Sequence, residues 1–157
     1  MSAQARRLLS ALGLAGACLA GVPARALAAD ETPPFFRHAS SCVAVLKRDA
    51  LALAPRAAAP DAEARARMVT LTEWGFAFIG AAYEQGLRNP RADELLDEAE
   101  QAQATQGADA LRRLSASCQV EGARLLDARG ALMRALARNR ANARVDKLLA
   151  DQARARR

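Results

Sequence analysis

Apolar residues recur at helical spacing along the chain from residue 34 onward. In the first such stretch they are Phe35, Ala39, Cys42, Val43, Leu46, Ala50 and Leu53. Steps of three and four residues place them on one face of an α-helix. Pro33-Pro34 suits the start of that helix, because a proline at the first helical position gives up no hydrogen bond. The pattern predicts a helix over 34–53 and a Pro-bounded connection over 54–60.

A second helix is predicted from Asp61, whose side chain can cap it, to about Leu87. Its segment 68–83 contains one charged residue, Glu73, and the only Trp and Tyr of the chain. A helix that is apolar nearly all round should be surrounded by protein, so we expect this helix to be central. Gly75 and Gly80 each cost about 1 kcal/mol inside a helix. We expect close helix packing at these two glycines to offset that cost.

The boundaries of the later helices are predicted from single Asn, Pro and Gly residues. Asn89-Pro90 predicts a break, with Asn89 capping a third helix and Pro90 at its first position, and this helix should reach about Gln106. Gly107 is either its end or a weak point within a longer helix. The apolar stripe that follows consists of Leu111, Leu114, Cys118, Gly122, Leu125, Leu132 and Leu136. Its near-heptad spacing predicts a long helix to about Ala137, and a last short helix is expected over 141–153.

No stretch alternates apolar and polar residues with β-branched enrichment, so no sheet is expected. The stripes that contain Cys42 and Cys118 should face each other across one core. The predicted fold class is therefore all-α, a compact bundle of four to five helices with one disulfide. A chain of this length fits a single helical domain over 29–157, ending in a basic helix.

The first residues have the three parts of a bacterial secretory signal. Arg6 and Arg7 form the positive region, an apolar run of 15 residues covers 8–22, and Ala26-Leu27-Ala28 offers a cleavage site. The run is shorter than the roughly 20 residues that span a bilayer. We predict a cleaved signal peptide over 1–28, hence no transmembrane segment after cleavage, and a periplasmic or secreted protein. A lipoprotein signal that ends at Cys18 is the alternative.

Export changes what the cysteines are expected to do. Cleavage leaves Cys42 and Cys118, which an oxidising compartment should join in a disulfide. That bond would close a loop of 77 residues, counting both cysteines, and would stabilise the fold by about 4 kcal/mol in the chain-entropy model. A single histidine and two oxidised cysteines, distant in sequence, do not form the usual four-ligand zinc set, so no metal and no cofactor is predicted.

The chain carries a formal net charge of +6, from 23 Lys and Arg against 17 Asp and Glu. Removal of residues 1–28 would leave 20 basic residues and a net charge of +3. Segment 134–157 has a net charge of +6 by itself, with eight basic and two acidic residues. Clustered arginines would suggest nucleic acid in a cytosolic protein, but export removes that expectation. The basic C-terminal helix could instead touch anionic envelope surfaces.

Candidate catalytic groups are few. His38 is the only histidine, no nucleophile-elbow motif accompanies it, and we expect it on the surface or at a helix end. The acidic cluster over 93–100 fits the solvated start of a helix, where the helix dipole favours negative charge. Glu73, beside Trp74, is a carboxyl group within an apolar helix. We expect it to bond to an arginine of a neighbouring helix, although it could also serve as a general acid or base.

These features favour an exported, non-enzymatic binding or interaction protein. An immunity-type inhibitor of a toxic envelope enzyme and a small helical chaperone are the candidate roles, each with a protein partner in the cell envelope. Aromatic residues anchor interfaces, so Trp74, Phe76, Phe78 and Tyr83 are the predicted binding residues. The alternative is an envelope hydrolase that uses Glu73 with an acidic residue of the third helix. No catalytic residue is assigned.

Overall fold

The computed structural model describes residues 32–58 and 61–155, and within them every regular element is an α-helix. The helices are α1 (Pro34–Ala58), α2 (Ala62–Glu84), α3 (Arg91–Ala104), α4 (Ala108–Asp127) and α5 (Ala131–Ala155). The predicted all-α class is confirmed, with five helices and the predicted disulfide between Cys42 and Cys118. The expected signal peptide over 1–28 and the alternative lipidation site at Cys18 lie outside the described residues.

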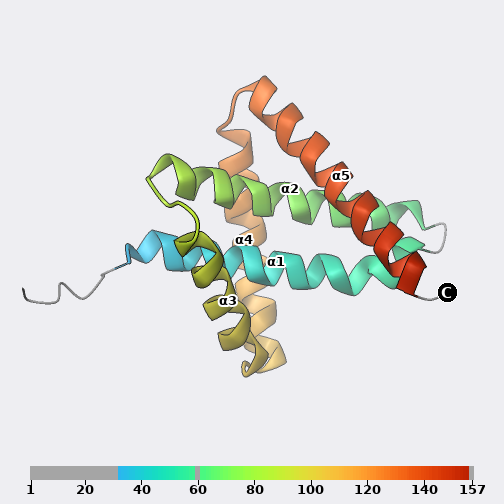
Figure 1. Ribbon diagram of the computed structural model, residues 1–157, viewed down its shortest axis with the longest axis horizontal. Helices are drawn as coiled ribbons and strands as arrows, with labels where there is room; N and C mark the ends of the chain where they lie inside the picture. The colour runs from blue at the N-terminus through green and yellow to red at the C-terminus, as the bar shows by residue number, and fades with distance from the viewer. Residues whose placement is uncertain (1–31, 59–60, 156–157) are drawn as a thin grey trace, which may run out of the picture. The chain divides into compact units, whose positions relative to one another are not determined.

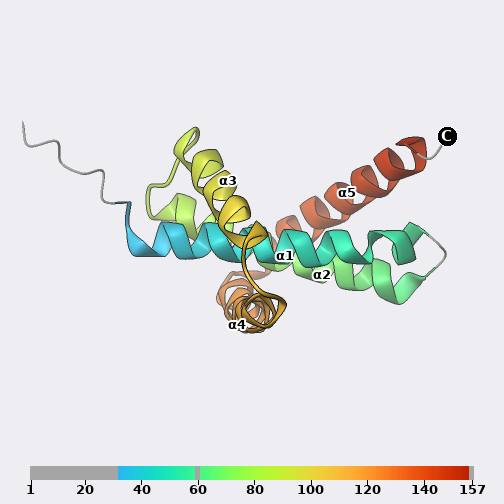
Figure 2. The same ribbon diagram turned by 90° about the horizontal axis from the view of Figure 1, so that it is seen from below.

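The helices of this compact unit form three layers (Figures 1 and 2). α1 and α2 run antiparallel, side by side, and make the central layer. α4 crosses one face of that layer and contacts both of its helices. α3 and α5 lie on the opposite face, where α3 packs on α1 and α5 packs chiefly on α2. As its apolar sequence predicted, α2 is central, and it shares that position with α1.

α1 extends to Ala58, beyond the predicted end at residue 53. Pro55 lies within its last turn. A proline there costs one hydrogen bond at the helix edge, and the alanines around it favour the helical state. Ala54 is fully buried against the start of α2, so packing also holds this turn in place. The predicted connection over 54–60 was therefore too long, because residues 54–58 belong to α1.

α3 begins one residue later than predicted, at Arg91, and Asn89 does not cap it. Pro90 occupies the cap position and makes no side-chain capping bond. The Asn89 side chain instead accepts a hydrogen bond from the hydroxyl group of Tyr83. The Asn89 side chain thus bonds to Tyr83 and does not cap α3, contrary to the prediction from the sequence.

The predicted long helix to Ala137 is wrong, because the chain turns at residues 128–130. α4 ends at Asp127 and Gly130 precedes α5, which then continues without a break to Ala155. Glycine disfavours a helix interior, so Gly130 is the local sequence signal for this helix end. Gly107 is resolved as a boundary, since it is the N-cap residue of α4.

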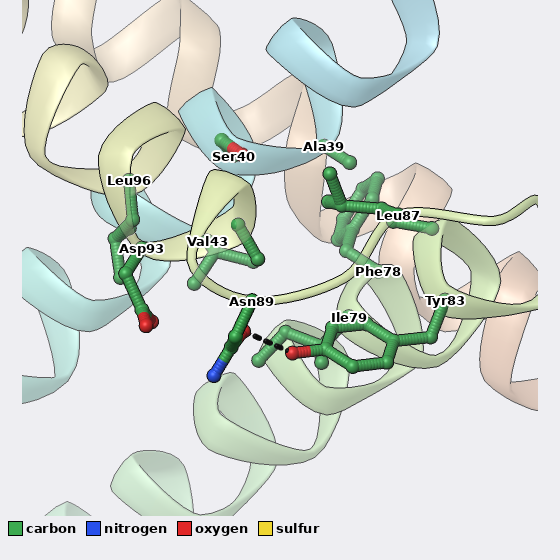
Figure 3. Close-up of a pocket in the computed structure, with 12 residues that line it drawn as sticks. Ala39, Ser40, Val43, Phe78, Ile79, Tyr83, Leu87, Asn89, Asp93 and Leu96 are labelled. Carbon is green, nitrogen blue, oxygen red and sulfur yellow. Dashed lines mark hydrogen bonds between the residues drawn. The ribbon is translucent and has the colours of Figure 1, made fainter.

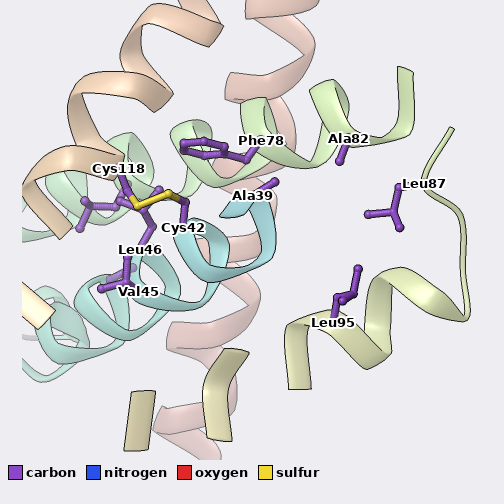
Figure 4. Packing of buried hydrophobic residues seen from close by; sticks show 11 residues of the cluster. Ala39, Cys42, Val45, Leu46, Phe78, Ala82, Leu87, Leu95 and Cys118 are labelled. Atoms are coloured by element: carbon purple, nitrogen blue, oxygen red, sulfur yellow. A yellow bond between two sulfur atoms is a disulfide. The ribbon is translucent and has the colours of Figure 1, made fainter. Parts of the chain in front are cut away.

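Two clusters of buried residues hold the unit together. The first contains the disulfide and joins α1, α2, α3 and α4, with Phe78 fully buried near that bond (Figure 4). The second lies towards the end of α1 and the start of α2, where Met68, Ala141 and Val145 pack α5 onto the central layer. Both clusters leave the middle of the central layer, on the side of α3 and α5, incompletely covered.

Close helix packing occurs at a different glycine from those expected. A Cβ atom added at Gly122 of α4 would lie 2.7 Å from the Cβ atom of Trp74 on α2. No atom lies within 4 Å of such a Cβ at Gly75, and only the guanidinium of Arg129 reaches that distance at Gly80. The packing predicted for Gly75 and Gly80 was therefore wrong, and Gly122 sets the approach of α2 to α4.

Candidate functional site

The uncovered part of the central layer is an apolar hollow of about 450 Å³ between α3 and α5, which we call the trough. Its walls include Leu96 of α3 and Val145 of α5. Its floor comes from both central helices. The main apolar contributors are Val43, Leu51, Met68, Phe76, Ile79 and Leu148. The trough exists because α3 packs on α1 and α5 packs on α2, so the two helices stand apart over the layer beneath them.

Two smaller hollows adjoin the trough at Ile79, which lines all three. One, of about 120 Å³, lies between α1, α2 and α3, and Figure 3 shows Val43, Ile79, Tyr83 and Leu96 around it. The other, of about 300 Å³, lies on the far side of the α2–α5 crossing. Ile79 is 38 % exposed. A large aliphatic side chain thus stands at the meeting point of three apolar hollows.

The apolar surface continues onto the first half of α5. Leu132, Met133 and Leu136 are exposed there, Leu132 by 72 %. Met133 and Leu136 also line the hollow beside Ile79. Leu132 and Leu136 belong to the stripe of the predicted long helix, but after the turn at residues 128–130 they are exposed on α5. Contiguous exposed apolar residues of this kind mark surfaces for partners.

The two helices beside the trough carry opposite net charge. α3 contains five acidic residues and one arginine, a net charge of −4. α5 contains six basic and two acidic residues, a net charge of +4. On α5, Arg144 lines the trough and Arg140 lines the hollow beside it. On α3, Asp93 lines the smallest hollow. The charged side chains that line the trough itself are both basic, Lys47 of α1 and Arg144 of α5, so a molecule bound there would meet positive charge.

The four aromatic residues predicted to bind a partner separate into two groups. Phe76 and Tyr83 are half-buried and line the hollows around Ile79. Phe78 is fully buried in the core around the disulfide. Trp74 packs against α4 on the other face of the layer, and the guanidinium of Arg67 lies 5.1 Å from its ring centre. The structure thus brings Phe76 and Tyr83 to one surface and keeps Trp74 away from it.

Glu73 has the neighbour that the sequence analysis expected. Its side chain is buried, and its Oε1 atom accepts a hydrogen bond of 2.7 Å from Nε of Arg138 on α5. This bond and the charge of Glu73 raise the pKa of Arg138. Arg138 itself is largely exposed, so the pair lies at the edge of the α2–α5 contact. The group at hydrogen-bond distance from Glu73 is thus a cation of α5 and not one of the α3 carboxyl groups that the hydrolase alternative pairs with it.

The acidic cluster of α3 is partly neutralised within the protein. Arg91 pairs with Glu94 at 3.0 Å and with Glu98 at 3.1 Å, and Lys47 of α1 pairs with Glu100 at 2.7 Å. The hydrogen bond that Arg91 donates to Glu94 raises the pKa of Arg91. These contacts fit a solvated helix face that also helps to hold α3 on α1.

His38 lies near the start of α1 and is partly exposed, but it makes contacts that the sequence analysis missed. Its Nε2 atom lies 2.7 Å from Oε2 of Glu121 on α4 and 3.7 Å from Sγ of Cys42. The ring also meets Phe78 edge to face, with 6.1 Å between ring centres. A sequence signal was present, since Glu121 follows Cys118 by three residues and His38 precedes Cys42 by four.

Comparison with known proteins gives no relative. The chain matches no protein-family model, and neither a curated protein nor a solved structure is significantly similar to it. Among the helices that the structure describes, none is long and apolar enough to cross a membrane.

Proposed function

We propose that this is a non-enzymatic binding protein of the cell envelope and that the trough takes an amphipathic segment of a partner protein. The observation that carries the proposal is the trough itself, an apolar hollow of about 450 Å³ with the half-exposed Ile79 where it meets two further hollows. Helix-in-groove recognition uses such a surface, into which apolar side chains of the partner insert.

The continuous apolar surface favours a polypeptide over a small molecule. From the trough it passes Ile79 and Phe76 to Met133 and Leu136 on α5. A small ligand would fill one hollow and leave the neighbouring apolar surface exposed to water, whereas a helix could cover several hollows at once. Phe76 and Tyr83, two of the predicted binding aromatics, would then contact the partner.

The charges that line the trough define the partner further. A segment lying in the trough would be stabilised by acidic side chains placed to reach Lys47 and Arg144, the charged residues that line it. The proposed partner segment is therefore apolar on one face and carries acidic residues beside that face.

Placement in the envelope rests on two features. Residues 1–28 have the pattern of a cleaved signal peptide, and the disulfide between Cys42 and Cys118 is the kind of bond that persists in oxidising compartments. An immunity-type inhibitor and a small chaperone both remain candidate roles. A single partner bound in equal amounts would favour the inhibitor, while several partners sharing an amphipathic segment would favour the chaperone.

The hydrolase alternative has no observation in its favour. Its proposed acid–base residue, Glu73, is hydrogen-bonded to Arg138 of α5. The acidic residues of α3 belong to a helix that packs on α1, and Glu94, Glu98 and Glu100 are paired with cations there. We therefore favour binding over hydrolysis.

The proposal is tested by affinity capture with matched surface variants. The full-length sequence, tagged at its C-terminus, is expressed in cells, and bound proteins are recovered and identified by mass spectrometry. Ile79→Arg should abolish capture of the partner, because it places a charge at the centre of the apolar surface. Val120→Arg is the control, since Val120 is an exposed apolar residue of α4, at 62 %, and lines none of the three hollows.

Equal capture by the two variants would overturn the assignment of the trough as the binding surface. Failure of the unsubstituted protein to capture any protein would overturn the protein partner itself. Circular dichroism of both variants confirms that the helices are retained, so a loss of capture reports on the surface and not on folding.

A further inference from the structure

Four side chains with metal-binding donor atoms meet between α1 and α4. The donor atoms of His38, Cys42 and Glu121 all lie within 4.8 Å of one another. The fourth is the sulfur of Cys118, bonded to Cys42 at 2.05 Å. Two sulfurs, one imidazole and one carboxylate are a donor set that zinc accepts in proteins, and tetrahedral zinc takes four such ligands.

The spacing of these residues on their helices is suited to a shared site. His38 and Cys42 are four residues apart on α1, and Cys118 and Glu121 are three residues apart on α4. Residues at these separations lie on one face of a helix. The two faces meet where the helices cross, and the Cα atoms of the cysteines are 5.3 Å apart there. Each helix therefore carries one sulfur and one nitrogen or oxygen donor on the face that it turns towards the other helix.

The contacts among the donors are already close to those a metal requires. With metal–ligand bonds of about 2.0–2.3 Å, ligand atoms around tetrahedral zinc lie roughly 3–4 Å apart. Nε2 of His38 lies 3.7 Å from Sγ of Cys42 and 2.7 Å from Oε2 of Glu121. In the disulfide state this nitrogen and oxygen are joined by a hydrogen bond. A metal ion between them would take the place of the hydrogen-bonded proton.

We propose that the dithiol form of the protein binds one zinc ion through His38, Cys42, Cys118 and Glu121. Binding releases two protons, one from each thiol, as two zinc–sulfur bonds form. The imidazole stays neutral and binds through Nε2, with its proton on Nδ1, and Glu121 binds as a carboxylate. The site goes beyond the binding function of the trough, which lies on the other face of the central layer. The disulfide and the zinc site exclude each other, because the same sulfurs make both.

The sulfur donors of the site are shielded from water, while its other two donors reach solvent. Cys42 and Cys118 are fully buried, and Phe78 covers the imidazole edge to face. His38 and Glu121 are partly exposed, at 40 % and 34 % of their side chains, and so provide a path from solvent to the sulfurs. Every cysteine is synthesised as a thiol, so the dithiol form exists before any oxidant acts on the chain.

The test uses cobalt(II), whose spectrum reports its ligands, as a probe for zinc. The full chain carries Cys18→Ser, so that Cys42 and Cys118 are its only thiols. A phosphine opens the disulfide, with water supplying the oxygen of the phosphine oxide and the two protons of the thiols, and is then removed without air. One equivalent of cobalt should produce thiolate-to-cobalt charge transfer and the intense visible bands of tetrahedral coordination. Zinc should displace it, and the disulfide form should give neither signal.

Ligand variants separate this site from two thiols that bind a metal unaided. His38→Ala and Glu121→Gln should each lower the zinc affinity of the dithiol form by at least about tenfold, since even outer partners of a metal ligand contribute that much. Glu100→Gln is the matched control on α3 and should bind zinc as the parent does. Calorimetry in buffers of different ionisation enthalpy should show two protons released per zinc at a pH where the free thiols are protonated.

Absence of charge transfer in the dithiol form would overturn the proposal. Equal affinity of the parent, His38→Ala and Glu121→Gln would also overturn it, because the sulfurs alone would then hold the metal. If opening the disulfide melts the helices, zinc should restore the helical circular dichroism of the parent and not that of His38→Ala. Failure of zinc to restore the parent would count against the site as well.

Discussion

At the scale of single residues, Gly122 makes the tightest helix contact among the glycines described. A Cβ atom there would meet the Cβ atom of Trp74 at 2.7 Å and a ring carbon of Phe78 at 3.2 Å. Both obstacles belong to α2, and a Cβ atom is bound directly to the backbone and cannot swing aside. Gly122 therefore allows α4 to approach the central layer closely enough for the disulfide to form beside it.

We predict that Gly122→Ala lowers the free energy of unfolding by about 1–3 kcal/mol, the usual cost of overpacking. Gly75→Ala is the matched control, because a Cβ atom there meets nothing within 4 Å. It should raise stability by about 0.5–1 kcal/mol, since alanine favours a helix interior. Urea denaturation of the two variants measures both changes. Changes of the same sign would contradict this account of the α2–α4 contact.

The sequence was a good guide to side chains whose neighbours lie on the same helix, and a poor one to those whose partners lie elsewhere. The arginine partner of Glu73 could be expected from its burial, although the sequence did not identify Arg138. His38 and Glu121 are 83 residues apart, and the signal for their contact was indirect: each lies within one helical turn of a cysteine of the predicted disulfide. The sequence also did not show which aromatic residues of α2 reach the surface at the hollows. Phe76 and Tyr83 do, whereas Trp74 packs against α4 and Phe78 is fully buried.

At the scale of the helices, Asp61 confirms the predicted start of the second helix. Its side chain accepts a hydrogen bond of 2.9 Å from the backbone amide of Ala64 and pairs with Arg56 of α1. The capping bond from Ala64 lowers the pKa of Asp61 below its ordinary value of 3.8, and the hydrogen bond from Arg56 lowers it further. The ionised carboxylate is therefore favoured by folding.

This shift predicts how the capping contribution depends on pH. A carboxyl group with a lowered pKa stabilises the fold above its unfolded pKa, near 3.8, and that contribution is lost as the pH falls through the lower folded pKa. At neutral pH, Asp61→Ala should have a lower urea midpoint than the parent, and the difference should narrow below about pH 4. Urea titrations at several pH values measure this. A difference that is constant across the range would contradict a role for the ionised cap.

Helix existence followed from apolar spacing, but helix ends depended on particular contacts. The turn at residues 128–130 interrupts a stripe whose spacing alone continues to Leu136, and the local signal for it is Gly130. Pro55 indicated an earlier end of α1, yet the burial of Ala54 extends the helix past it. Asn89 looked like a cap until the structure showed its bond to Tyr83. Periodicity cannot reveal contacts of this kind.

At the scale of the whole molecule, the disulfide joins two layers. Cys42 belongs to the central layer and Cys118 to the covering helix α4, 76 positions along the chain (Figure 4). Fully buried residues of α1 and α2, Leu46 and Phe78 among them, lie beside the bond. The link therefore restricts the unfolded chain over the greater part of its described length.

We predict that replacing both cysteines by alanine lowers the free energy of unfolding by about 4 kcal/mol, the chain-entropy value for a loop of this size. Guanidinium denaturation of the parent and the double variant measures the difference. Circular dichroism should show that the double variant retains its helices under native conditions, because the rest of the core is unchanged. A loss below about 1 kcal/mol would mean that the bond does not restrict the unfolded chain as proposed.

The trough depends on how all the helices pack, so it could not be predicted from the sequence. It arises because α3 and α5 occupy the same face of the central layer without closing over it. The sequence did indicate its chemistry, through the aromatic residues of the second helix and the basic C-terminal segment. It did not indicate Ile79, which occupies the same face of α2 as Phe76 and Tyr83 and stands at the meeting point of the three hollows.

The most direct test of the central claim is site-specific photocrosslinking in intact cells, with a benzophenone amino acid replacing Ile79 in one strain and Val120 in another. If the trough binds a partner protein, light should produce a covalent adduct with that protein from position 79 and none from position 120. An adduct of equal yield from both positions, or an adduct from position 79 only with lipid or with a second copy of this chain, would contradict the account.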